Sequence, residues 1–113
     1  MESRFARQPG PEIDVEELAQ FMERPDIQVV DVREDWEYRR GHVPGVVPLP
    51  LSQIAARLAE IPTDRPLAII CEHGERSLTV ADFLVRRGLA AVSVRGGTSA
   101  WVRSGRAIER PRV

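Results

Sequence analysis

The sequence contains no lysine and no asparagine, and it has one cysteine, Cys71. All 16 basic residues are therefore arginines. Without a lysine amine, the protein can form neither a Schiff base nor a Walker-type phosphate loop. Without asparagine, a Cys-His-Asn hydrolase triad is excluded. A single cysteine also excludes an internal disulfide and is typical of a reducing compartment.

The sequence also lacks a strong charge of either sign and a long apolar run. Its net charge is −1, so no basic surface favours nucleic acid. Residues 1–8 lack the apolar core of a signal peptide, and no segment approaches transmembrane length. We therefore expect a cytoplasmic protein with no nucleic-acid or membrane partner. The 113 residues predict one domain, with its core at about 12–105 and a peripheral tail at 106–113.

Helical and β-strand patterns alternate along the chain, which favours an α/β fold with a parallel sheet. The spacing of Asp14 and Glu17 predicts a capping box at the first helix. Because parallel strands end at the same edge of a sheet, the strand ends at Arg33 and Cys71 should lie close together. The periodicity predicts helices at 14–24, 34–40, 52–60, 77–87 and through 100–102, and strands at 27–32, near 46, at 67–71 and at 91–94.

Cys71 stands where an apolar strand ends and a helix is expected to begin. Backbone N–H groups and the helix dipole converge at such a position and stabilise a thiolate. We expect the N–H groups from Glu72 to Ser77 to cradle an anionic sulfur, with Gly74 allowing the close backbone approach. Arg76 would neutralise the bound sulfur or bind an anionic donor. Ser77 would cap the helix and donate to the sulfur.

Other residues near the loop leave alternatives open. We expect Glu72 and Glu75 to point to solvent, because an inward carboxylate would oppose a thiolate and repel an anionic donor. Arg33 either binds substrate or pairs with a carboxylate such as Glu37. His73 is either a base for Cys71 or, as its place in a tight loop favours, a solvent-facing residue.

Asp31 and His42 are candidates for structural support. Asp31 either orients the loop or satisfies nearby backbone donors, and His42 is interpreted as a hydrogen-bonded structural residue. A metal site formed by Cys71, His73 and His42 is not expected, because no ligand-pair spacing supports it. No metal and no organic cofactor is predicted.

Four motifs in order resemble the rhodanese family, and the match covers roughly residues 15–104. The motifs are Val30-Asp31-Val32-Arg33 followed by Glu34-Asp35-Trp36-Glu37-Tyr38, then Gly41-His42-Val43-Pro44-Gly45-Val46, then Cys71-x-x-Gly74-x-Arg76-Ser77, and finally Gly96-Gly97 with Trp101. The resemblance implies a rhodanese-like three-layer α/β/α sandwich around a parallel sheet of about five short strands.

The resemblance also implies sulfurtransferase activity. Cys71 would take sulfane sulfur from thiosulfate or another persulfide donor and pass it to a thiol or cyanide, with a sulfur-relay protein as a further candidate partner. One alternative is a non-catalytic rhodanese-like binding or regulatory module. Another is a phosphatase or arsenate reductase, which the loop disfavours because it runs only six residues from Cys71 to Arg76. The related phosphatases have a wider loop.

Overall fold

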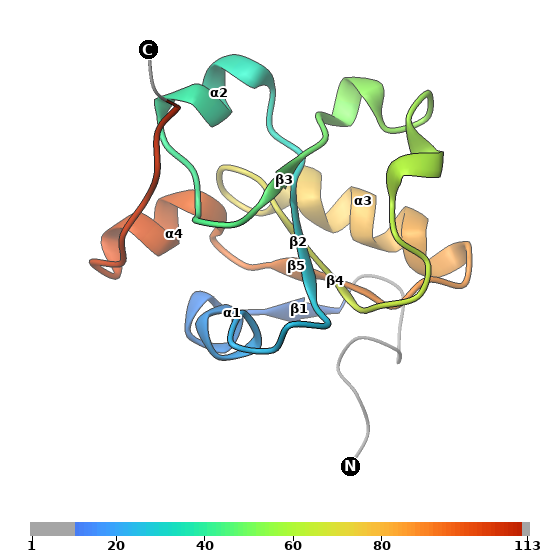
Figure 1. Ribbon diagram of the computed structural model, residues 1–113, viewed down its shortest axis with the longest axis horizontal. Helices are drawn as coiled ribbons and strands as arrows, with labels where there is room; N and C mark the ends of the chain where they lie inside the picture. Colours follow the sequence, from blue (N-terminus) through green and yellow to red (C-terminus); the bar gives the residue numbers. More distant parts are fainter. Residues whose placement is uncertain (1–10, 112–113) are drawn as a thin grey trace.

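The computed structural model describes residues 11–111, in which five strands form one parallel sheet in the order β1-β5-β4-β2-β3 (Figure 1). The strands are β1 (Glu12–Ile13), β2 (Gln28–Asp31), β3 (Val47–Pro48), β4 (Leu67–Ile70) and β5 (Ala91–Val94). The predicted α/β class and parallel sheet are confirmed. The sequence did not predict β1, because two residues are too few to show a strand periodicity.

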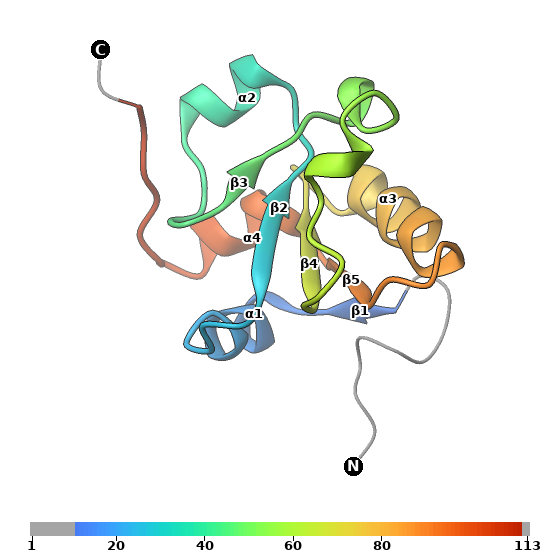
Figure 2. The same ribbon diagram turned by 45° about the vertical axis from the view of Figure 1, so that its right-hand side comes forward.

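Helices and short 3-10 turns cover both faces of the sheet (Figure 2). One apolar cluster joins β2 and β4 to α3, and the other joins the strands to α1 and α4. Leu84 of α3 belongs to the first cluster, while Leu18 of α1 and Trp101 of α4 belong to the second. The helices are α1 (Val15–Phe21), α2 (Asp35–Arg40), α3 (Glu75–Arg86) and α4 (Gly97–Arg103), and the 3-10 turns are η1 (Leu51–Gln53) and η2 (Leu58–Glu60).

Two of the predicted helices show where local patterns succeed and fail. The capping box of Asp14 and Glu17 is present at the start of α1. The helix predicted at 52–60 is wrong, because this segment forms η1 and η2 instead. The backbone N–H of Leu51 donates to the Val32 carbonyl, which ties the start of the segment to the end of β2. Ser52 donates its hydroxyl to Glu34 rather than capping a helix.

The carboxyl ends of β2 and β4 form the edge that carries the candidate site. The two strands are neighbours with Asp31 paired to Ile70, so residues 33 and 72 emerge side by side. From β2 the chain continues to β3 on one side, and from β4 it continues to β5 on the other. Ligands of parallel α/β sheets bind at this kind of reversal in strand order.

The C-terminal segment, expected to be peripheral, runs beside α4 and reaches α2 (Figure 1). His42 and Glu109 form an antiparallel bridge with two backbone hydrogen bonds of 2.9 and 2.8 Å. The Trp101 indole N–H donates to the Ala107 carbonyl at 2.8 Å, and Ile108 packs against the second apolar cluster. None of the helices within residues 11–111 has the length and apolarity needed to cross a bilayer. The signal-peptide expectation concerns residues 1–8, which lie outside the described residues.

Candidate active site

Cys71 follows β4 directly and is fully buried. Its Sγ accepts hydrogen bonds from the backbone N–H groups of Gly74, at 3.1 Å, and Ser77, at 3.3 Å. The thiol in turn donates to the Ser77 hydroxyl at 3.4 Å. Gly74 precedes α3 with φ of +111°, a value that an L side chain rarely adopts. The loop thus surrounds the sulfur, and the N–H groups of Gly74 and Ser77, at the start of a 12-residue helix, point toward it.

The start of α4 holds the loop from behind. The carbonyls of Cys71 and Glu72 accept the backbone N–H groups of Thr98, at 2.8 Å, and Ser99, at 3.0 Å. This approach requires glycine at position 97, where a Cβ atom would stand 2.4 Å from the Cys71 carbonyl oxygen. The late Gly-Gly pair therefore has a packing role at the site as well as a turn-forming one.

Ser77 does not cap a helix, which corrects the sequence prediction. Because α3 begins at Glu75 and its N-cap is Gly74, Ser77 lies inside the first turn. Its hydroxyl donates to the Gly74 carbonyl at 3.1 Å and lies 2.7 Å from the hydroxyl of Ser93. Ser93 is fully buried on β5 and was missed by sequence reasoning. Its only signal was a hydroxyl within an otherwise apolar buried strand.

Arg76 pairs with Glu37 of α2 rather than pointing at open solvent. The two guanidinium nitrogens donate to the two carboxylate oxygens at 2.7 and 2.8 Å. The hydrogen bond from Arg76 lowers the pKa of Glu37, although partial burial opposes this shift. Glu37 likewise raises the pKa of Arg76. The arginine predicted to bind an anion is therefore already neutralised by a carboxylate.

Arg33 is also occupied by carboxylates, but Glu37 is not among them. Its Nε and Nη2 donate to Asp31, and Nη2 also donates to the Gly41 carbonyl at 2.8 Å. Its Nη1 donates to Glu72 at 3.0 Å. Burial alone would lower the pKa of Arg33, but Asp31 and Glu72 outweigh burial and raise it.

These contacts correct the expected orientation of Glu72. Its side chain turns toward Arg33 and is 33% exposed. The register of β2 and β4 explains this pairing, because residues 33 and 72 leave adjacent strands at the same level. Glu75 and His73, by contrast, are exposed, as expected.

His42 has the structural surroundings that the sequence suggested. Its ring stacks on Tyr38 with centroids 3.8 Å apart, and Nδ1 lies 2.9 Å from the Tyr38 carbonyl oxygen. Asp31 accepts the Arg33 backbone N–H at 3.0 Å, as the second of its two expected roles requires, and it also binds the Arg33 guanidinium rather than the Cys71 loop directly. Among residues 11–111, no three histidine, cysteine or carboxylate side chains gather as a group that would hold a metal ion.

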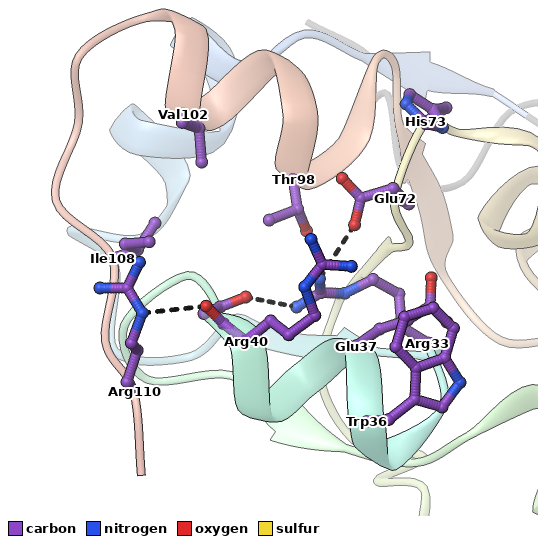
Figure 3. A pocket seen from close by; sticks show the side chains of 11 residues that line it. Arg33, Trp36, Glu37, Arg40, Glu72, His73, Thr98, Val102, Ile108 and Arg110 are labelled. Atoms are coloured by element: carbon purple, nitrogen blue, oxygen red, sulfur yellow. Dashed lines mark hydrogen bonds and ion pairs between the residues drawn. The ribbon is translucent and has the colours of Figure 1, made fainter.

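A cleft of about 450 Å³ opens beside the loop (Figure 3). Glu72 and His73 line it from the loop, and α2, α4 and the C-terminal segment contribute the remaining walls. Within the described residues, Cys71 and Arg76 are not part of its lining. The cleft therefore borders the loop that holds the sulfur without reaching the sulfur itself.

The parallel α/β sheet with a cysteine loop at its carboxyl edge places the protein among rhodanese-like α/β domains, and the chain belongs to the rhodanese-like domain family. The family model matches residues 14–104. A sulfurtransferase from Allochromatium vinosum is 38% identical over 88% of this chain and 95% of its own length. The thiosulfate sulfurtransferase GlpE of Shewanella oneidensis is 34% identical over 79% and 89% of the two chains. A crystal structure of a rhodanese-related protein from Thermoplasma volcanium superposes with a TM-score of 0.83, at 29% identity over 88% and 98% of the two chains.

Proposed function

We propose that the protein is a sulfurtransferase that carries sulfane sulfur as a persulfide on Cys71. The observation that carries this proposal is the pair of backbone N–H groups, from Gly74 and Ser77, directed at Sγ from the start of α3. Such donors stabilise an anionic sulfur through hydrogen bonds and the helix dipole. Relatives named sulfurtransferase at 34–38% identity support the same activity.

The reaction has two displacements at sulfur. In the first, the Cys71 thiolate attacks the outer sulfur of a donor such as thiosulfate. The new S–S bond forms as the old one breaks, and sulfite leaves with the electron pair. In the second, a thiolate or cyanide attacks the outer sulfur of the Cys71 persulfide, and the cysteine thiolate leaves. A covalent intermediate thus divides one transfer into two steps.

In this proposal, most side chains of the loop do not bind the substrate directly. The amides of Gly74 and Ser77 hold the sulfur, and the hydroxyl of Ser77 adds a third contact. Arg76 and Arg33 have a structural role, because each already binds carboxylates of the protein. Anion binding by this site therefore depends mainly on backbone amides.

Because Cys71 has no exposed surface, a donor reaches Sγ only after the loop or a covering side chain shifts. A persulfide-forming thiol must also remain reduced between turnovers. We therefore place the activity in a reducing compartment, in line with the cytoplasmic location expected from the single cysteine. A small sulfur donor, and a thiol, cyanide or sulfur-relay protein as acceptor, complete the proposal.

Intact mass spectrometry tests this function directly. The reduced protein should gain the mass of one sulfur atom on exposure to thiosulfate or to an alkyl persulfide, and cyanide should remove it. Cys71→Ser, which keeps the size and polarity of the side chain, should gain nothing. Absence of a gain with every sulfane-sulfur donor would contradict the proposal and favour a binding module.

A further inference from the structure

Two arginines and two exposed apolar side chains line the cleft beside the Cys71 loop. Trp36 of α2 is 61% exposed, and Val102 of α4 is 48% exposed. The two side chains lie on opposite sides of the same cleft (Figure 3), so the cleft has apolar surface on two of its walls, as small-molecule sites commonly do. Arg40 and Arg110 line the same cleft.

The charged side chains of the cleft differ in whether they already have an ion-pair partner. Glu37 pairs with Arg76, and Glu72 pairs with Arg33, so each of these carboxylates already has a guanidinium partner within the protein. Among the described residues, Arg40 and Arg110 have no ion pair with a carboxylate. Arg40 lies over the Trp36 ring at 5.9 Å, and Arg110 donates its Nε–H only to a backbone carbonyl. The cleft therefore presents two available cations beside an aromatic ring.

The position of these groups connects them to the proposed reaction. Figure 3 shows Arg40 extending across the cleft from α2 toward the side on which Glu72 and Thr98 lie. Glu72 directly follows Cys71, and Thr98 donates its hydroxyl to the Cys71 carbonyl at 3.1 Å. A ligand held by Arg40 would thus lie next to the segment that must shift to expose Sγ.

We propose that this cleft binds the sulfur acceptor, and that the acceptor is a small thiol carrying carboxylate or phosphate groups. Its anionic groups contact Arg40 and Arg110, and its less polar part lies against Trp36 and Val102. The cleft volume of about 450 Å³ lies in the range of small-molecule sites rather than of extended protein interfaces. This inference rests on the proposed function for its chemistry but not for the binding itself.

The chemical step that the cleft serves is balanced without a further reactant. The Cys71 persulfide, left as an anion by the first displacement, takes a proton from solvent, and the acceptor thiol loses its proton to solvent. The acceptor thiolate then attacks the outer sulfur of the protonated persulfide. An S–S bond forms to the acceptor, the Cys71 S–S bond breaks, and the cysteine leaves as a thiolate. The acceptor departs as a persulfide that keeps the proton of the transferred sulfur. Holding the acceptor beside the loop favours this step by proximity.

The first test compares adjacent arginines of α2. Arg40→Gln removes the charge that faces the cleft, whereas Arg39→Gln removes an exposed charge that pairs with Asp35. With glutathione as the acceptor, Arg40→Gln should raise KM about tenfold with little change in kcat, because it removes a direct contact between ions of opposite charge. Arg39→Gln should stay within about twofold of the parent protein. Transfer to 2-mercaptoethanol, which has no carboxylate or phosphate group for Arg40 to bind, should change much less than transfer to glutathione.

Equal losses in the two variants would overturn the inference, because they would reduce the effect to overall charge. An unchanged KM for glutathione in Arg40→Gln would overturn it as well. A second measurement separates this failure from failure of the proposed function. S-methylglutathione, which cannot accept sulfur, should bind the Cys71→Ser protein, bind more weakly as salt rises, and bind poorly to Cys71→Ser/Arg40→Gln. Absence of binding to Cys71→Ser would overturn the acceptor site even if Cys71 forms a persulfide.

Discussion

The guanidinium of Arg76 binds both carboxylate oxygens of Glu37, with hydrogen bonds of 2.7 and 2.8 Å. This pair joins the first turn of α3 to α2 across 39 positions of sequence. The Glu37 side chain is only 10% exposed, so the contact is well protected from solvent. Glu37 also stabilises the start of its own helix, because its carboxylate accepts the backbone N–H of Glu34.

Replacing Glu37 with glutamine should therefore destabilise the protein. We expect the free energy of unfolding at pH 7 to fall by about 1–2 kcal/mol, a value reduced from that of a fully buried pair because Arg76 is partly exposed. Urea denaturation followed by tryptophan fluorescence measures this difference. Arg39→Gln breaks a similar but exposed pair with Asp35 and should cost less than about 0.5 kcal/mol.

The same variant gives a prediction for pH. Arg76 lowers the pKa of Glu37 in the folded state below its ordinary value of 4.5. The stability that the ionised carboxylate contributes is therefore fully present above that value and is lost as pH falls through the lower, folded-state pKa. The stability difference between the parent protein and Glu37→Gln should shrink below pH 4.5. A constant difference down to the acid transition would contradict this account.

The sequence predicted the elements around this site better than it predicted their contacts. The loop at Cys71, the strand at 91–94 and the C-terminal end of α2 at Gly41 depend on local patterns, and all three were found. The pairing of Arg76 with Glu37 and that of Arg33 with Glu72 were not predicted, because contacts across 39 positions depend on strand order and register. Residues 33 and 72 meet only because β2 pairs with β4 at Asp31 and Ile70.

The failed helix at 52–60 has a similar cause. The segment has a helical spacing of apolar residues, and Ile54 is buried as that spacing implies. Long-range hydrogen bonds from the backbone of Leu49 and Leu51 to the end of β2 fix its entry, however, and Ser52 binds Glu34. Tertiary contacts thus outweigh the local helical preference, which is worth only a fraction of a kcal/mol per residue.

Gly97 should be intolerant of substitution because a side chain there would meet the backbone of the Cys71 loop. In Gly97→Ala the new Cβ would stand 2.4 Å from the Cys71 carbonyl oxygen and 2.6 Å from that of Glu72. We expect the free energy of unfolding to fall by about 3 kcal/mol or more, because backbone atoms of Cys71 and Glu72 must move.

Gly105→Ala is the matched control, since its φ of +83° is also positive but no atom lies within 4 Å of the new Cβ. Its free energy of unfolding should fall by only about 1 kcal/mol. Equal losses in urea denaturation would show that backbone conformation, and not the contact with the loop, sets the cost.

The buried hydroxyls of Ser77 and Ser93 predict an effect on the reactivity of Cys71. The Ser77 hydroxyl has one proton and three neighbours, namely Sγ, the Gly74 carbonyl and the Ser93 hydroxyl. When the sulfur is a thiolate, the Ser77 proton should turn toward it. Ser93 lies 3.5 Å from the same carbonyl and can then replace Ser77 as the donor to that carbonyl.

In Ser93→Ala this replacement is lost, so the Ser77 hydroxyl should remain on the carbonyl. Alkylation of Cys71 at pH 7 should therefore be about threefold slower in Ser93→Ala and about tenfold slower in Ser77→Ala. An unchanged alkylation rate in Ser93→Ala, beside a slower one in Ser77→Ala, would limit Ser93 to packing.

Glu72 should restrict the use of thiosulfate as a donor. Its carboxylate binds Arg33, which Asp31 also binds, so this cluster holds two carboxylates and one guanidinium beside the residue that must receive sulfur. A dianionic donor approaching Cys71 meets that excess negative charge with two charges, whereas an alkyl persulfide carries at most one and is repelled less. In Glu72→Gln the amide oxygen can still accept the Arg33 hydrogen bond while the charge is lost. We expect kcat/KM for thiosulfate to rise about tenfold and kcat/KM for the persulfide of 2-mercaptoethanol to rise much less. Glu75→Gln makes the same charge change at an exposed position of the same loop, where solvent screens it, and should give a smaller increase. Equal increases in the two variants would mean that the total charge of the loop, rather than the position of Glu72 beside Arg33, determines the choice of donor.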